Sequence, residues 1–140
     1  MTERFFLERF ESAQADVYAE VLEELRAGSK RSHWMWFIFP QMKGLGRSEH
    51  ALYYGIGSLE EASAYLRHPV LGLRLVQCTQ LVNDVEDCSI REIFNAPDDM
   101  KFRSCMTLFA RASEDDAVFR RALDKYFGGR PDPLTLELLR

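Results

Sequence analysis

The residues best suited to chemistry lie in one stretch, SHWMWFIFPQMKGLGRS, which spans residues 32–48. Its two tryptophans, Trp34 and Trp36, have flat faces on which the planar ring of a ligand could stack. His33 precedes them, and an imidazole can act as a general acid or base near neutral pH. An aromatic run of this density also suits a buried core. The stretch is therefore interpreted as core, as a cleft wall, or as both.

The second half of this stretch is a glycine-containing loop between two cations. Gly44 and Gly46 allow backbone N–H groups to approach an anion closely, and a helix predicted to begin after Ser48 adds a partial positive charge. The loop lacks both GxGxxG and the GK[ST] of a P-loop, and a solvated surface loop is the alternative interpretation. The predicted ligand-binding residues are Trp34, Trp36, Gln41, Lys43, Gly44, Gly46, Arg47 and Ser48.

The order of aromatic residues, glycines and basic residues favours a ligand with both a ring and a phosphate. We therefore expect binding, with hydrolysis as a further option, of a nucleotide-like or ADP-ribose-like small molecule. Glycosidic hydrolysis needs a carboxylate near the scissile bond, and Glu49 is the nearest one in sequence. His33 and Glu49 are thus the candidate catalytic residues. The alternative is a non-enzymatic protein–protein interaction module, because Trp, Phe, Met and Arg are typical interface anchors.

A second candidate region follows Pro97, where Lys101 and Ser104 share one face of a predicted helix. The competing interpretation is an amphipathic helix with a charged outer face. No metal site is predicted, because the three histidines are far apart in sequence and no HExxH or Cys/His cluster occurs. The three cysteines, Cys78, Cys88 and Cys105, lie in apolar surroundings and are expected to be inert reduced thiols.

Length and composition exclude several classes of protein. The 140 residues, 46% hydrophobic and 29% charged, suit one globular domain rather than a disordered chain. The net charge of −4 and dispersed basic residues argue against a nucleic-acid or anionic-membrane partner. The start of the chain, MTERFFLERFESAQ, has no signal-peptide apolar core, so we expect a cytoplasmic protein. No cofactor is predicted, and homo-oligomer formation is left open.

Helical periodicity dominates the chain. Residues 5–27 form one helix or two with a break near residues 12–16, whereas 34–39 fit either a short helix or a buried strand. The apolar residues of 70–82 mark the candidate central buried helix. Further helices are expected at 49–54, after the capping boxes Ser58/Glu61 and Ser89/Glu92, and at 98–112, 114–127 and 134–139. We therefore predict a mainly α, compact multi-helical single domain over residues 1–140, with little or no β-sheet.

Several segments carry a family resemblance: LERFESAQADVY, SKRSHWMWFIFPQMKGLGRS, EASAYLRHPVLGLRL, IFNAPDDMKFRSCMTLFA and LDKYFGG. Together they resemble the bacterial family catalogued as domain of unknown function 1810, which is mainly α-helical and has no established activity. The resemblance thus implies the fold but no catalytic residue. More distantly, Ser48-Glu49-His50 resembles an element of NADAR-type, YbiA-like domains, which are associated with ADP-ribose and N-glycoside chemistry. The other elements of that group do not align, so this analogy bears only on substrate class.

Overall fold

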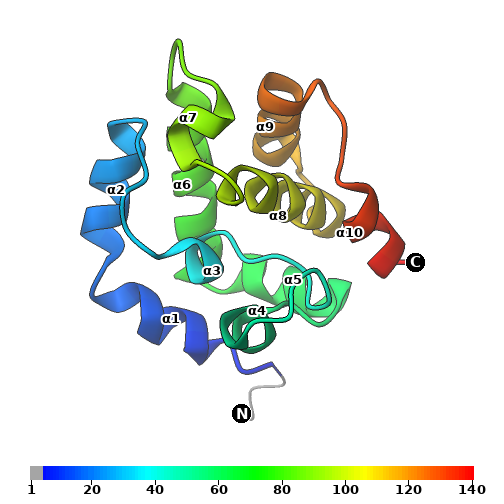
Figure 1. Ribbon diagram of the computed structural model, residues 1–140. Coiled ribbons are helices and arrows are strands. Elements are labelled where there is room, and N and C mark those ends of the chain that lie inside the picture. Colours follow the sequence, from blue (N-terminus) through cyan, green and yellow to red (C-terminus); the bar gives the residue numbers. More distant parts are fainter. Residues whose placement is uncertain (1–4) are drawn as a thin grey trace.

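The computed structural model describes residues 5–140 and contains ten helices in this range (Figure 1). Residues 1–4 lie outside the described residues. They belong to the predicted domain and to the N-terminal segment that lacks a signal-peptide apolar core. The helices are α1 (Glu8–Ala15), α2 (Tyr18–Arg26), α3 (Met35–Ile38), α4 (Glu49–Tyr54), α5 (Leu59–Arg67), α6 (Leu71–Asp84), α7 (Ile90–Phe94), α8 (Asp98–Ala112), α9 (Ala117–Phe127) and α10 (Pro133–Leu138).

The predicted mainly α fold class is confirmed. Between residues 5 and 140 the structure has no β-strand, and one isolated bridge pairs Met42 with Ile56. The helices share one core that extends from Leu7 to Leu123 in sequence. In the described part of the chain, no helix has both the length and the apolar character needed to cross a membrane.

The two ambiguous segments near the N-terminus are both helical. Residues 5–27 form two helices, with the break at Asp16 and Val17, and the second ends before Gly28, whose φ of 68° is left-handed. Residues 35–38 form the single turn α3, and Pro40 follows it closely. Ser32 does not cap this turn, because its hydroxyl bonds to Glu20 and Glu24 of α2 instead.

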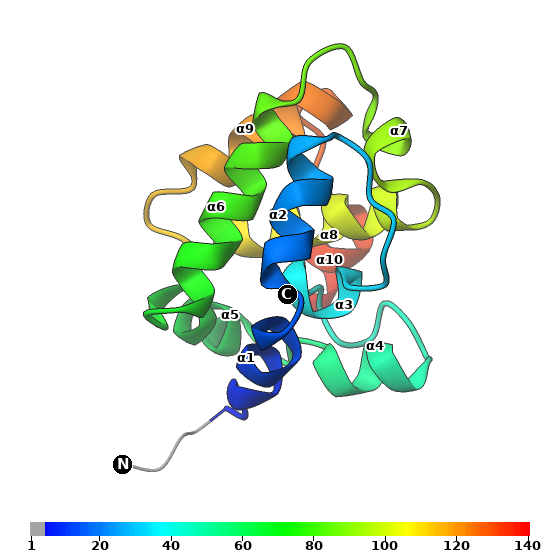
Figure 2. The same ribbon diagram turned by 90° about the vertical axis from the view of Figure 1, so that its left-hand side faces the viewer.

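The prediction that residues 70–82 form the central helix is wrong. The central helix is α8, against which α5, α7, α9 and α10 all pack (Figure 1). All residues of Ser104–Phe109 are buried, whereas Leu73 of α6 is 72% exposed. Helical periodicity did not identify α8 as the central helix, because this helix buries polar residues. The hydroxyls of Ser104 and Thr107 donate to carbonyls of their own helix, at 3.1 and 2.9 Å, and can therefore be buried. Helix α6 instead lies to the side, next to α2 (Figure 2).

A buried ion pair joins α1 to α5, and the same arginine also binds two carbonyls at the end of α4. Arg9 donates to Glu61 Oε2 at 2.7 Å, to the Tyr53 carbonyl at 2.7 Å and to the Gly55 carbonyl at 3.1 Å. The other carboxylate oxygen of Glu61 accepts the Gly57 N–H at 2.9 Å. Glu61 therefore does not complete the predicted capping box with Ser58, whose hydroxyl still accepts the Glu61 N–H. The Ser89/Glu92 capping box is complete.

Candidate functional site

The aromatic stretch divides into a buried and a partly exposed tryptophan. Trp34 is 1% exposed and packs its ring near Phe39 and Phe94. Its indole N–H donates to Glu24 Oε1 at 3.0 Å, so its polar edge is satisfied inside the protein. These contacts support the core interpretation for Trp34. Trp36, two residues later, is partly exposed and is therefore the more accessible of the two tryptophans.

Glu24 of α2 holds the start of this stretch in place. Its carboxylate accepts the backbone N–H groups of Arg31 at 2.7 Å and Ser32 at 3.0 Å, the Ser32 hydroxyl at 2.7 Å and the Trp34 indole. Burial acts to raise the pKa of Glu24, but these hydrogen bonds stabilise the carboxylate more strongly and lower the pKa to about 2. The role of Glu24 has no local sequence signal, because nothing in the pattern EVLEELR distinguishes one glutamate from another.

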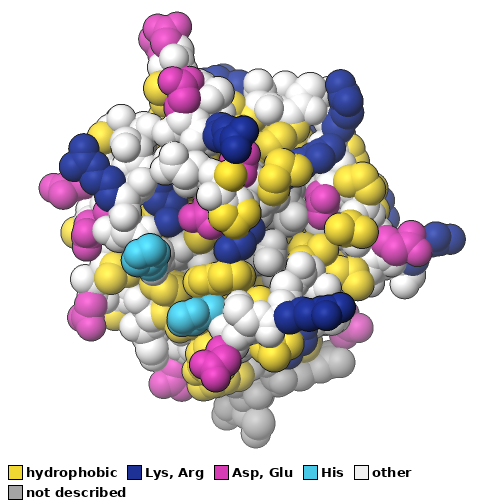
Figure 3. Space-filling model, viewed as in Figure 1, with side chains coloured by type: hydrophobic (Ala, Val, Ile, Leu, Met, Phe, Trp, Pro, Cys, Tyr) yellow, Lys and Arg dark blue, Asp and Glu magenta, His cyan; other side chains and the backbone are white. Residues whose placement is uncertain are grey.

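Trp36 is the meeting point of three elements. The ring of His50, from α4, lies nearly parallel to the Trp36 ring, with centroids 6.1 Å apart and 17° between planes. The ammonium of Lys101, from α8, lies 3.5 Å from the Trp36 ring centroid. The stack continues along α4 to Tyr54, whose ring is 6.2 Å from that of His50. We call Trp36, His50 and Lys101 the Trp36 surface. The face drawn in Figure 3 carries two histidines with hydrophobic, basic and acidic side chains around them.

Asp98 and Lys30 lie beside this surface, and Asp98 contacts the lysine that belongs to it, Lys101. Asp98 Oδ2 is 2.9 Å from Lys30 Nζ, and its Oδ1 is 3.5 Å from Lys101 Nζ. Lys30 also donates to the Ser32 carbonyl at 2.6 Å and lies over the Trp34 ring. The structure thus joins one predicted residue of the second region, Lys101, to the aromatic stretch.

Two backbone hydrogen bonds hold the base of the glycine loop, and the two cations of the loop are exposed. Lys43 N–H donates to the Ile56 carbonyl, and Ile56 N–H donates to the Gln41 carbonyl, at 2.8 and 2.9 Å. Gly44 has a φ of 108°, which favours glycine. Between residues 5 and 140, neither cation of the loop, Lys43 or Arg47, forms an ion pair, and both are exposed.

The remaining predicted site residues lie at the start of α4 and before α3. Ser48 caps α4, because its hydroxyl accepts the Ala51 N–H at 3.1 Å, and Gly46 packs against Ala51. Glu49 is exposed and borders an open depression of about 600 Å³, which His50, Leu52, Tyr53 and Tyr54 also line. His33 is exposed before α3. Catalytic roles for His33 and Glu49 stay predictions.

Ser104 does not accompany Lys101 at the surface. It is buried, and its hydroxyl donates to Asp132 Oδ2 at 3.1 Å. The same oxygen accepts the N–H and the hydroxyl of Thr135, at 3.1 and 2.6 Å, and so caps α10. Ser104 therefore helps to attach α10 to α8.

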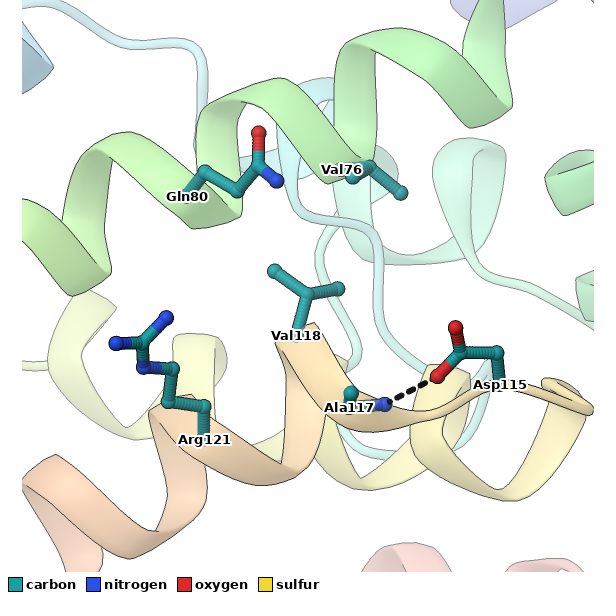
Figure 4. A pocket seen from close by; sticks show the side chains of 6 residues that line it. All are labelled: Val76, Gln80, Asp115, Ala117, Val118 and Arg121. Atoms are coloured by element: carbon teal, nitrogen blue, oxygen red, sulfur yellow. Dashed lines mark hydrogen bonds between the residues drawn. The ribbon is translucent and has the colours of Figure 1, made fainter.

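Another hollow, of about 350 Å³, lies between α6 and α9 (Figure 4). Val76 and Val118 form its apolar part, while Arg121 and Asp115 extend from opposite ends. None of the predicted site residues lines it. Among the described residues, no group of three or more His, Cys, Asp or Glu side chains could hold a metal ion. Burial raises the pKa of the Cys78 thiol to about 12 and that of Cys105 well above its usual range, so both are neutral.

Comparisons with known proteins identify a family but no activity. Residues 4–139 match the family described as "Protein of unknown function (DUF1810)". Among solved structures, the chain is similar to the conserved hypothetical protein Rv1873 from Mycobacterium tuberculosis, with 58% sequence identity, 98% coverage of each chain and a TM-score of 0.97. No curated protein matches the chain. The NADAR analogy gains no support from these comparisons. Because the match covers nearly the whole sequence, the chain belongs to the DUF1810 family.

Proposed function

We propose that the protein binds a small anionic molecule with a planar ring, of the nucleotide class, at the Trp36 surface. The observation that carries this proposal is the position of the Lys101 ammonium, 3.5 Å from the centroid of the partly exposed Trp36 ring. A cation and a partly exposed aromatic ring at one point are two groups that a phosphorylated ring compound can use.

The ring of the ligand stacks on the aromatic groups at this surface. The rings of Trp36, His50 and Tyr54 form one row, in which Trp36 comes from α3 and the other two come from α4. The base of the ligand can stack on this row and extend it. Stacking of a base on an aromatic side chain contributes about 1–3 kcal/mol. Trp34 takes no part, because it is 1% exposed.

The phosphate of the ligand binds the ammonium of Lys101. In the free protein this ammonium makes a cation–π contact with Trp36, worth between about 0.5 kcal/mol when exposed and about 2 kcal/mol when desolvated, and the Lys101 side chain is mostly buried. Hydrogen bonds to a charged group contribute about 1.5–3 kcal/mol, so Lys101 gains by turning from the ring to a phosphate oxygen. Lys43, Arg47 and the backbone of Gly44 and Gly46 are the predicted extension of this phosphate site.

Tryptophan fluorescence tests the proposal directly, because Trp34 and Trp36 are the two tryptophans of the sequence. Titration with ADP or ADP-ribose should quench the emission, and Trp36→Phe, which retains buried Trp34, should abolish the quenching. By calorimetry, Trp36→Ala should weaken binding by about tenfold, from the stacking energy lost. Tyr53→Ala is the control, since this aromatic is also exposed but lies outside the Trp36 surface, and it should bind normally. If neither nucleotide binds at millimolar concentration, the proposal fails.

A second candidate function is a protein–protein interaction module. It is supported by three apolar side chains that are at least half exposed, Phe6, Leu52 and Tyr53. The rings of Phe6 and Tyr53 meet edge to face, with centroids 6.2 Å apart, so these exposed side chains adjoin one another. Light scattering separates the candidates: self-association that Tyr53→Ala abolishes, without any nucleotide binding, favours the module.

A further inference from the structure

One carboxylate, that of Asp98, is shared by two lysines: Lys101, which lies over the Trp36 ring, and Lys30, which lies over the Trp34 ring. Each of its oxygens faces a different ammonium, Oδ2 towards Lys30 at 2.9 Å and Oδ1 towards Lys101 at 3.5 Å. All three side chains are mostly buried. The geometry is that of two cations holding one oxyanion, with the oxyanion supplied by the protein itself.

We infer that Asp98 is an internal competitor of the ligand and lowers the affinity of the Trp36 surface for phosphate groups. This inference rests on the proposed function, because it concerns regulation of that same site. Two positive charges against one negative charge leave the cluster at +1, so an incoming phosphate gains only one uncompensated cation unless the carboxylate moves away. Binding is therefore an exchange in which phosphate oxygens replace Asp98 at the ammonium of Lys101.

The neighbouring acid, Asp99, provides a matched control. It lies in the same first turn of α8, and its Oδ1 accepts the Met100 N–H at 2.9 Å. Within residues 5–140 it forms no ion pair with either lysine. Asp99→Asn changes the net charge and the charge at the helix start as Asp98→Asn does, but leaves the shared carboxylate in place.

The test is calorimetric titration of the full chain with inorganic phosphate and, separately, with ADP. Asp98→Asn should bind phosphate about three- to tenfold more tightly than the wild type, because the substitution removes a negative charge that repels phosphate and neutralises the two lysines. Asp99→Asn should resemble the wild type. Adding Lys101→Met to Asp98→Asn should remove the gain. Equal phosphate affinity in Asp98→Asn and Asp99→Asn overturns the inference, whether or not ADP binds.

A measurement on the wild type covers the case in which Asp98→Asn does not fold. The carboxyl ¹³C resonance of Asp98 should shift on addition of ADP or phosphate, while that of Asp99 stays unchanged. A ligand that binds at Trp36 and leaves the Asp98 resonance unmoved overturns the inference but retains the proposed function. In the converse outcome, Asp98→Asn binds phosphate more tightly than the wild type while ADP fails to quench the fluorescence of Trp36. That result supports the role of Asp98 as a competitor and contradicts nucleotide binding.

Discussion

Glu24→Gln tests whether one buried carboxylate holds the aromatic stretch in place. The wild-type carboxylate accepts hydrogen bonds from Arg31, Ser32 and Trp34, and its pKa falls from an ordinary value of 4.5 to about 2. Each pKa unit corresponds to about 1.4 kcal/mol, so the carboxylate contributes roughly 3 kcal/mol to the free energy of unfolding. Glutamine keeps the shape but loses the charge, and it directs an NH₂ group towards N–H donors.

The pH dependence of this effect has a definite sign. Because the pKa of Glu24 is lower in the folded state, its contribution is complete above pH 4.5 and is lost as the pH falls towards 2. The difference in unfolding free energy between the wild type and Glu24→Gln should therefore fall from roughly 3 kcal/mol at pH 6 to about 1 kcal/mol at pH 3.

Urea unfolding, followed by circular dichroism at several pH values, measures this difference. Glu20→Gln is the matched control, since Glu20 is one turn away on α2, is exposed and accepts a single hydrogen bond from the Ser32 hydroxyl, at 2.8 Å. It should cost less than about 0.5 kcal/mol, as for other surface substitutions. A Glu24→Gln effect that is equally small, or that does not change between pH 6 and pH 3, would refute the reasoning.

Two further predictions concern the core and the buried ion pair. Trp34→Ala should lower the free energy of unfolding by about 3–5 kcal/mol in urea titrations, the usual cost of truncating a buried aromatic residue, and a loss near 1 kcal/mol would contradict its place in the core. Arg9→Met should cost about 3–5 kcal/mol, because it leaves the Glu61 carboxylate buried without its cation. The double variant Arg9→Met/Glu61→Met should be the more stable of the two in the same assay, and equal or lower stability would show that the ion pair is not the source of the loss.

Local signals predicted the helices well, because helix ends depend on residues close in sequence. Ser89 and Glu92 form the predicted capping box, Asp132 caps α10, and Gly28 adopts the left-handed conformation typical of a glycine after a helix, here α2. These features need only neighbours within one turn, so composition and spacing are sufficient to identify them.

Burial was harder to predict, because it depends on which helices surround which. The polar residues of α8 suggested an exposed face, yet Ser104 lies inside and bonds to Asp132 of the distant C-terminal segment. Glu61 followed the spacing of a capping box, but Arg9 of α1 takes its carboxylate. In both cases a partner far away in sequence satisfies the polar group, and no local pattern contains that partner.

By itself the sequence determined the mainly α fold and the unusual character of residues 32–48. Tertiary structure alone decided which tryptophan faces outward: Glu24 from α2 fixes Trp34 inside, while Lys101 from α8 and His50 from α4 meet at Trp36. The physical reason is that helix formation follows local periodicity and capping, whereas a surface that can bind a ligand requires side chains from separate helices to converge.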